Sequence, residues 1–284
     1  MTTIQAKSKC TYWIASYPKS GNTWLRMLLA TYFSGLDVPL NINALPSGTL
    51  AYHRKRFDEL LGLETADFPT ETLTDLRPRI YDMMAGSQDF QFVKTHECFT
   101  RTSSGEAVFS EATSAGAILI VRNPLDVAVS MSHFLRMSID DTITRMSRNS
   151  QSSQRIQTEL IPHETGSWSS FAQSWFEGSM PLLVVRYEDL LDQPEMAFSK
   201  VLSFMNEPIN EARLQKTIAF NAFENLRAQE LKDGFAAMQT GAASFFRKGQ
   251  NNNWKQQLTS EQQERLHSDH VSMMKQLGYE PQIV

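Results

Sequence analysis

Four short runs rich in apolar residues alternate along the chain with longer segments of helical periodicity. Several of the runs are continuously apolar, as expected of strands that are buried on both faces of a sheet. Strands that alternate with helices favour a mainly parallel central sheet flanked by helices. The pattern therefore predicts a single α/β domain over residues 1–284. The expected strands cover residues 12–15, 90–93, 117–121 and 182–185.

The segments between these runs predict helices, and local signals mark some of their ends. Asn123 is a favourable N-cap, and Pro124 suits the first helical position. Near the end of the chain, Thr259 or Ser260 is expected to cap the last helix. The expected helices cover residues 23–33, 50–63, 78–84, 124–136 and 194–205, and residues 70–76 lead into the third of them.

Each apolar run changes to polar residues at its carboxyl end. Lys19, His96, Arg122 and Tyr187 follow the four runs in turn. In open α/β sheets, ligands bind outside the carboxyl ends of the strands. We therefore expect these four side chains to converge at one edge of the sheet, although they are far apart in the chain.

The first run leads into a stretch that is typical of an anion-binding loop. Pro18 and Gly21 interrupt the strand before the first helix begins. The first amides of a helix have no internal partner, and the helix dipole is positive there. Gly21 allows close approach of an anion, while Lys19 and the hydroxyl of Thr23 add donors. From this stretch alone, an ordinary strand–turn–helix with a solvated lysine remains the alternative.

The order of residues in this loop differs from that of the usual nucleotide triphosphate loop, in which the lysine follows the second glycine. Residues 17–24, Tyr-Pro-Lys-Ser-Gly-Asn-Thr-Trp, closely resemble the signature of the sulfotransferase family. In that family the loop holds the 5′-phosphosulfate of 3′-phosphoadenosine 5′-phosphosulfate (PAPS), on a fold like that of P-loop nucleotide-binding proteins. At position 22, where many members have Thr, this chain has Asn. In this respect it resembles bacterial members of the family that act on natural products. The resemblance implies donor contacts from Lys19, Ser20, Gly21, Asn22, Thr23 and Trp24.

Two further stretches resemble the family's motifs for the 3′-phosphate. In residues 121–130, the resemblance implies that Arg122 and Ser130 bind this phosphate, which a guanidinium and a hydroxyl suit chemically. Residues 246–250, here called the clasp segment, resemble the family's Arg-Lys-Gly segment that closes over the same phosphate. Without the resemblance, Arg122 is equally a cap or an ion-pair partner of Asp126. The clasp residues implied are Arg247, Lys248 and Gly249.

Three aromatic residues are implied near the adenine of the donor. Flat aromatic rings can sandwich a base, and the resemblance suggests Trp24 and Phe223 for this role. Tyr187, within Arg-Tyr-Glu-Asp-Leu, matches a family residue near the adenine. Each of these aromatics, taken alone, is more typical of a core position.

Sulfuryl transfer requires that negative oxygens be neutralised and that the acceptor lose a proton. Lys19 can reach the bridging oxygen or the sulfuryl group, and His96 suits proton removal because an imidazole titrates near neutral pH. The family's catalytic base lies in a Lys-Thr-His that matches residues 94–96. Glu97 is a rival base, because some branches of the family use a carboxylate. Lys94 is either a second neutralising cation or a structural charge.

Composition narrows the classes of function. The net charge of −4 gives no support for a broad nucleic-acid surface. The first ten residues are polar and do not resemble a secretory signal, and no apolar run approaches the roughly 20 residues needed to cross a bilayer. Cys10 and Cys98 do not make a disulfide framework, so we expect a reduced, cytoplasmic setting.

We therefore predict a PAPS-dependent sulfotransferase that uses no metal and acts on a hydroxyl, or less readily an amine, of a small molecule or natural product. A nucleotide-dependent kinase is disfavoured by the missing Gly-Lys-Ser/Thr order. A non-catalytic nucleotide binder is disfavoured because Lys19 and His96 are both present.

The acceptor and the assembly are open at this stage. We expect acceptor specificity to depend on residues 37–56 and 141–166. Residues 141–166 and 231–244 are each either a mobile substrate-facing segment or plain surface. Residues 255–264 resemble a dimerisation segment of the family's cytosolic branch, in which a Val normally stands in place of Ser260. Monomer and homodimer are both compatible with this pattern.

Overall fold

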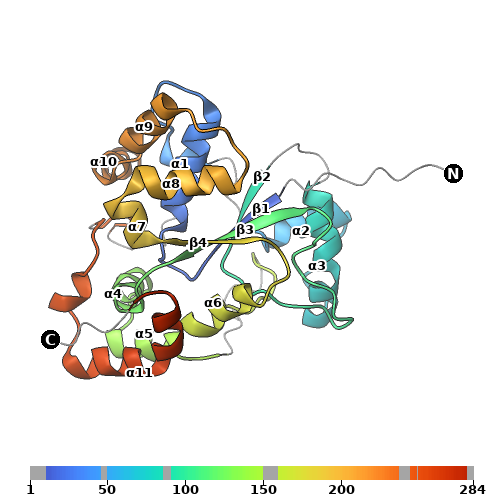
Figure 1. Ribbon diagram of the computed structural model, residues 1–284. Coiled ribbons are helices and arrows are strands. Elements are labelled where there is room, and N and C mark those ends of the chain that lie inside the picture. Colours follow the sequence, from blue (N-terminus) through green and yellow to red (C-terminus); the bar gives the residue numbers. More distant parts are fainter. Residues whose placement is uncertain are drawn as a thin grey trace. The chain divides into compact units, whose positions relative to one another are not determined.

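A computed structural model describes residues 11–45, 50–85, 91–149, 159–236, 244–247 and 249–279. Within these residues, four parallel strands form one sheet in the order β2-β1-β3-β4 (Figure 1). All of β1 and nearly all of β3 is buried, as continuously apolar strands require. The predicted parallel α/β sheet is confirmed. The strands are β1 (Thr11–Ser16), β2 (Gln91–Thr95), β3 (Ser114–Val121) and β4 (Leu182–Arg186).

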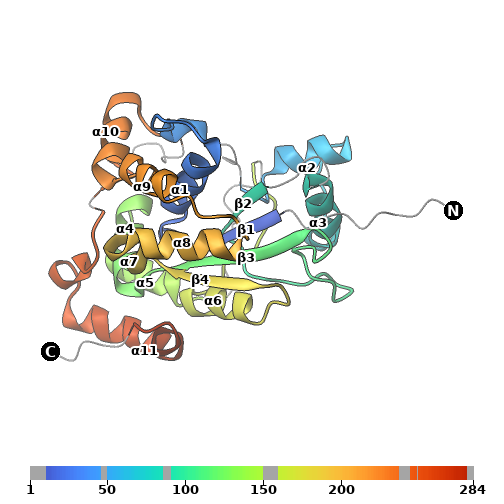
Figure 2. The same cartoon turned by 45° about the horizontal axis from the view of Figure 1, so that its top comes forward.

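Helices separate β1 from β2 and β3 from β4, whereas β2 leads to β3 with no helix between residues 96 and 113 (Figure 2). No described helix is both long and apolar enough to cross a membrane. The helices are α1 (Asn22–Ser34), α2 (Arg54–Leu61), α3 (Thr70–Ala85), α4 (Pro124–Leu135), α5 (Ile139–Met146), α6 (Trp168–Phe176), α7 (Tyr187–Asp192), α8 (Pro194–Phe204), α9 (Glu211–Phe220), α10 (Phe223–Asp233) and α11 (Ser260–Gln276), with 3₁₀ turns η1 (Ile42–Ala44) and η3 (Asn253–Gln256).

The predicted caps are confirmed at two helices. The Asn123 side chain accepts from the Leu125 amide at 3.0 Å, with Pro124 in the first position of α4. Thr259, rather than Ser260, is the N-cap of α11, and it forms a capping box with Gln262. Because a cap depends on only three or four neighbouring residues, the sequence alone is enough to locate it.

The predicted starts of two helices are wrong. The helix expected from residue 50 begins at Arg54, because Leu50 and His53 form β-bridges with Lys94 and Leu160. Helix α3 passes through Pro78 instead of beginning there, and the proline ring is buried. An interior proline removes one helix hydrogen bond and crowds the preceding turn, so other contacts of the helix must offset this cost. Within the segment 141–166, whose structure the sequence leaves open, residues 141–146 belong to helix α5.

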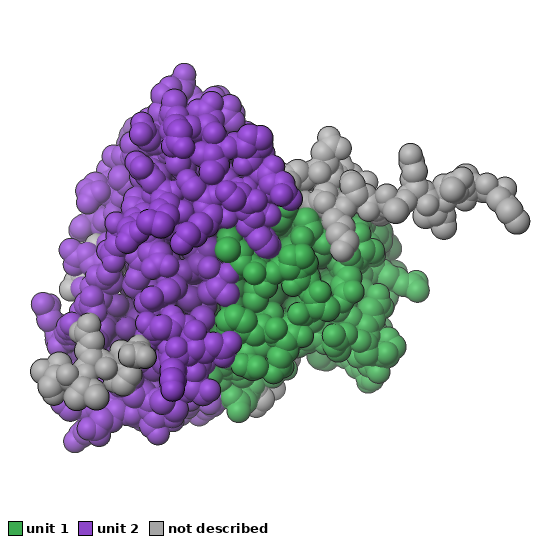
Figure 3. Space-filling view, viewed as in Figure 1, with its two compact units in different colours: residues 1–17, 49–119, 149–183 green, residues 18–48, 120–148, 184–284 purple. Residues whose placement is uncertain are grey.

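The chain forms two compact units (Figure 3). Unit 1 comprises residues 1–17, 49–119 and 149–183, and unit 2 comprises residues 18–48, 120–148 and 184–284. The prediction of a single domain over the whole chain stays a prediction. The two units are described separately below.

Aromatic packing forms the core of unit 1 beneath β1. The Trp13 ring lies 4.9 Å from both Tyr81 of α3 and Phe109, measured between ring centroids. Phe109 in turn lies 4.7 Å from Trp175 of α6. The Trp13 indole donates to the Ser114 hydroxyl at 2.7 Å, so its polar atom is paired inside the core. This core supports the ends of β1 and β2.

Candidate functional site

The loop of residues 17–24, here called the phosphate loop, has an unusual backbone in residues 18–24, which belong to unit 2. Lys19 has a φ of 71°, a conformation that non-glycine residues rarely adopt and that is concentrated at functional sites. Gly21 has a φ of 104° and caps α1, and a Cβ there would lie 2.7 Å from the Tyr187 ring. Asn22 and Thr23 occupy the first turn of α1, where amides lack intrahelical acceptors.

The Lys19 ammonium lies between two aromatic rings of unit 2. Its Nζ is 4.2 Å from the Phe134 centroid and 4.0 Å from the Phe245 centroid. Burial, reinforced by the positive charges of Arg122 and Arg247, lowers the pKa of Lys19 to about 8, while Glu230 opposes the shift. A desolvated ammonium interacts more strongly with an anion than a hydrated one does. The position of these rings could not be read from the sequence.

Arg122 connects the phosphate loop to the clasp segment. Its Nη1 donates to the Lys19 carbonyl at 3.3 Å, and its Nη2 donates to the Gln250 carbonyl at 3.1 Å. The guanidinium also lies 4.2 Å over the Tyr187 ring. Of the four residues expected to converge, the structure therefore brings three together in unit 2. His96 belongs to unit 1, and its convergence with them stays a prediction.

A hydrogen-bonded cluster holds the ends of β3 and β4 side by side. The Glu188 carboxylate accepts from the Asn123 amide at 3.0 Å and from the Tyr279 hydroxyl at 2.7 Å. Asn123 follows Arg122, and Glu188 follows Tyr187, so these bonds keep the two candidate residues adjacent. Tyr279 lies near the C-terminal end of the sequence, and no pattern in the sequence predicts its hydrogen bond to Glu188.

Asp126 anchors the loop that follows the clasp segment. This buried residue in the first turn of α4 accepts from the Asn252 amide at 2.7 Å and the Trp254 amide at 3.3 Å. Burial raises its pKa, and Arg122 and the backbone amides oppose that shift. Sequence reasoning treated Asp126 only as an ion-pair partner of Arg122, and missed this role.

In the clasp segment, Gly249 is packed against the first residue of α10. Its φ is 59°, and a Cβ at this position would overlap the Phe223 ring. Arg247 is half-buried, and burial followed by repulsion from Arg122 lowers its pKa. Lys248 lies outside the described residues. Ser130 lies on α4, partly exposed, and its role as a phosphate ligand stays a prediction.

The aromatic residues expected near the adenine all lie in unit 2. The Trp24 and Tyr187 rings meet edge to face at 5.7 Å between centroids, and the Trp24 indole donates to the Asn221 carbonyl at 3.0 Å. Trp24 and Phe223 are only partly buried, and both pack against one hydrophobic cluster. Partial burial leaves part of each ring accessible to a base.

In unit 1, His96 follows β2 and is oriented by the neighbouring strand. Its Nδ1 lies 2.6 Å from the Ser16 carbonyl oxygen and 3.2 Å from the Ser16 hydroxyl. Because a carbonyl can only accept, Nδ1 carries the proton and the lone pair of the neutral ring is on Nε2. This is the form of a histidine that accepts a proton. Lys94, two residues earlier, is half-buried within β2.

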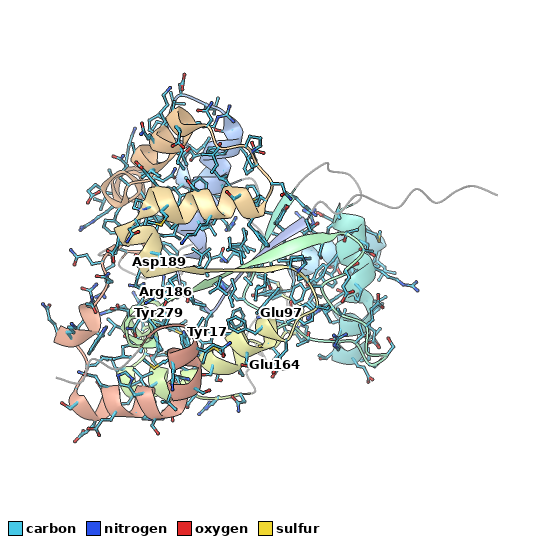
Figure 4. All side chains as sticks on the ribbon, viewed as in Figure 1. Tyr17, Glu97, Glu164, Arg186, Asp189 and Tyr279 are labelled. Atoms are coloured by element: carbon cyan, nitrogen blue, oxygen red, sulfur yellow. The ribbon has the colours of Figure 1, made fainter. Side chains whose placement is uncertain are left out.

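Glu97, the rival base, is labelled in Figure 4. Its side chain is fully buried and ion-paired with Arg77 of α3. Its other oxygen lies 3.5 Å from the Tyr81 hydroxyl. A carboxylate held in this way is poorly placed to take a proton from a substrate, so the geometry favours His96. Arg77 did leave a signal in the sequence, because it shares the buried face of α3 with Leu73 and Ile80.

Cys98 has the environment of an inert thiol. Its Sγ donates to the Thr165 carbonyl at 3.1 Å, and burial raises its pKa to about 12. A thiol with a raised pKa is a poor nucleophile at neutral pH. Cys10 lies outside the described residues.

The sequence is similar to known proteins over nearly its whole length. The family model for the sulfotransferase domain matches residues 10–278. The chain is 25% identical to sulfotransferase 1A1 of Canis lupus familiaris over 276 residues, covering 93% of this chain and 83% of that protein. It is 24% identical to sulfotransferase 1 family member D1 of Rattus norvegicus, covering 93% and 83%.

Solved structures share the fold at low identity. The mouse sulfotransferase SULT7A1 complexed with PAP matches with a TM-score of 0.59 and 18% identity, covering 94% of this chain and 85% of that chain. Retinol dehydratase in complex with androsterone and inactive cofactor PAP matches with a TM-score of 0.58 and 17% identity, covering 93% and 80%.

Proposed function

The chain belongs to the sulfotransferase family, and we propose that its donor is PAPS and its acceptor is a hydroxyl, or less readily an amine, of a small molecule or natural product. Family membership supports sulfuryl transfer over the phosphoryl transfer of a kinase. The observation that carries the choice of donor is Arg122, which bonds to both the phosphate loop and the clasp segment. PAPS carries phosphate groups on both its 3′ and 5′ positions, and therefore needs two such anion sites.

We assign the chemistry to three residues. In the proposed reaction, the acceptor oxygen attacks sulfur, a new S–O bond forms, and the S–O bond to the 5′-phosphate breaks. Nε2 of His96 takes the acceptor proton, while Lys19 neutralises the charge that develops on the leaving phosphate. Lys94 is proposed as a second cation toward the sulfuryl group.

We propose that PAPS is bound by residues of the phosphate loop, by Arg122 and Ser130, by the clasp segment and by the aromatic residues near the expected adenine site. Two solved structures with the same fold contain PAP, and this supports the proposal that the same fold binds the donor nucleotide here. Cytoplasmic location, the absence of a metal from the reaction and the choice between monomer and homodimer stay predictions. The proposed donor-binding residues are Lys19, Ser20, Gly21, Asn22, Thr23, Trp24, Arg122, Ser130, Tyr187, Phe223, Arg247, Lys248 and Gly249.

Binding of 3′-phosphoadenosine 5′-phosphate (PAP) tests the donor. We expect PAP to bind more tightly than AMP and to raise the melting temperature, because a ligand that binds only the folded state stabilises it. Arg122→Ala is expected to make the free energy of PAP binding less favourable by about 2 kcal/mol, since a charge-assisted hydrogen bond is lost. This corresponds to an increase of roughly 30-fold in the Kd for PAP. Calorimetry on both nucleotides gives the comparison. Equal binding of PAP and AMP by the wild type would exclude a 3′-phosphate site at Arg122.

Turnover itself is measured with labelled PAPS and a panel of phenols, alcohols and peptide natural products. We expect at least one class to accept the label without added magnesium. A single-turnover assay distinguishes an enzyme from a binder: PAP affinity without transfer to any acceptor would favour a non-catalytic nucleotide binder.

Gly249→Ala tests whether the clasp segment must pack closely on Phe223. We expect a loss of PAP affinity of at least tenfold, because the added methyl overlaps the ring and the backbone φ of 59° disfavours alanine. Gly35→Ala is the matched control, since Gly35 has a φ of 62° with nothing within 4 Å of the added Cβ. The Gly35→Ala control has the same unfavourable backbone φ for alanine, but its added methyl group overlaps no side chain. If both variants bind PAP like the wild type, the clasp assignment is wrong.

A further inference from the structure

A buried ion pair in unit 1 holds the residue that follows His96. Arg77 and Glu97 are 2% and 0% exposed, and the guanidinium also donates to the Pro162 carbonyl. The backbone of Glu97 is bonded on both sides: its amide donates to the Thr95 hydroxyl at 3.1 Å, and its carbonyl accepts from the Trp175 indole at 3.1 Å. An unpaired charge at this depth is strongly unfavourable, so the pair specifies one arrangement of the segment.

A second contact holds His96 itself. The Tyr52 hydroxyl is hydrogen-bonded to the backbone of His96. The Tyr52 ring also stacks on His163, with 3.7 Å between ring centroids and 28° between planes. His163 follows Pro162 in the chain, and Nδ1 of His163 is bonded to the Ile161 carbonyl at 3.1 Å.

These contacts form a closed ring. Arg77 connects Glu97 to Pro162, Tyr52 connects His96 to His163, and two peptide bonds complete the circuit. Tyr52 therefore holds the backbone of His96, while Arg77 and Trp175 hold the next residue, Glu97. These three side chains come from three separate segments, all within unit 1.

We propose that Arg77, Glu97 and Tyr52 are positioning residues that keep the His96 imidazole against the Ser16 carbonyl. The inference rests on the proposed role of His96 as base. The Nδ1–carbonyl distance of 2.6 Å selects the tautomer with its lone pair on Nε2. A shift of the His96 backbone breaks this bond and allows the tautomer with the proton on Nε2. Molecules with that tautomer have no lone pair on Nε2 and cannot accept the proton there.

The double variant Arg77→Met/Glu97→Leu separates positioning from stability. Replacement of a buried ion pair by apolar residues of similar volume is often neutral or stabilising, so we expect a melting temperature near that of the wild type. Turnover with the best acceptor of the panel is expected to fall about 100-fold in kcat, with little change in KM for PAPS, since small misplacement of a catalytic group has effects of this size.

Nitrogen-15 NMR of the histidine side chains measures the tautomer directly and needs no acceptor. His96→Ala identifies the His96 signals among the six histidines. We expect the wild type to show His96 protonated on Nδ1, and the double variant to show a mixture of both tautomers. Tyr52→Phe removes a single oxygen, keeps the stacked ring, and is expected to show the same change with a smaller loss of kcat, about tenfold.

Arg54→Met is the matched control. Arg54 is also a buried arginine of unit 1. It donates to the Thr65 carbonyl at 2.7 Å and to the Leu160 carbonyl at 3.4 Å, and neither of these acceptors belongs to the ring of contacts. We expect it to lower the melting temperature without changing kcat or the His96 tautomer.

The outcomes are distinguishable. Wild-type kcat and an unchanged tautomer in both the double variant and Tyr52→Phe would overturn the positioning role. If the double variant does not fold, Tyr52→Phe decides by the same two readouts. Full activity of His96→Ala would instead overturn the proposed function of His96, while the tautomer measurement would still report on the ring.

Discussion

His96→Ala is expected to lower turnover by about 10²–10⁴-fold, the usual effect of removing a general base. PAP affinity should be nearly unchanged, because His96 is assigned to the acceptor proton and not to the nucleotide. The wild-type hydrogen bond of 2.6 Å from Nδ1 to the Ser16 carbonyl leaves Nε2 as the basic nitrogen. Rates with saturating PAPS from pH 5 to 9, together with PAP calorimetry, give both quantities.

His96→Asn is the informative partner of this variant. The asparagine amide can still donate to the Ser16 carbonyl, so the local structure is preserved, but no basic nitrogen replaces Nε2. We therefore expect His96→Asn to be as inactive as His96→Ala. If His96→Ala stays near wild type while Glu97→Gln is folded and inactive, the carboxylate is the base and our assignment is wrong.

Lys19→Met is expected to lower kcat by about 10²–10³-fold, the typical effect of removing one group that stabilises the developing charge. Methionine keeps most of the length of the side chain, and so continues to fill the space between Phe134 and Phe245. PAP binding should weaken only modestly, since the helix amides and Arg122 remain. Lys55→Met, on the exposed surface of α2, is the control for removal of a positive charge.

The pH dependence gives a second test of Lys19. Its pKa is lowered from 10.5 to about 8, chiefly by burial, so the free enzyme loses the ammonium as pH rises through about 8. We expect kcat/KM for PAPS to fall over that range, because this quantity reports the ionisation of the free enzyme. Bound phosphate favours the ammonium, so kcat should fall only at higher pH. A flat kcat/KM profile from pH 7 to 9.5 would contradict the role of Lys19.

Burial of the Lys19 ammonium, with a smaller contribution from repulsion by Arg122, also affects the stability of the fold. A lysine whose folded-state pKa lies below its unfolded value opposes folding while it is charged in both states. That cost is present below about pH 8 and disappears as pH rises toward the unfolded pKa of 10.5. Lys19→Met is therefore expected to raise the melting temperature at pH 7 while lowering activity, which a loss of fold could not do.

Much of the fold was predictable because it depends on short-range pattern. Continuous apolar runs identify buried strands, and Asn123 and Thr259 cap helices through neighbours only a few positions away. The phosphate loop is similarly local, since Lys19 and Gly21 adopt positive φ within the same short turn. These features need no knowledge of the rest of the chain.

Tertiary structure decided the features that depend on partners distant in the chain. By its place in the sequence Glu97 is a possible base, but in the folded chain its carboxylate is paired with Arg77 of α3 in the core. The tautomer of His96 depends on Ser16, a residue of the adjacent strand, and the lowered pKa of Lys19 depends chiefly on burial between two rings from separate segments. Proton affinity and tautomer depend on burial and on nearby charges and donors, and only the folded chain brings those groups together.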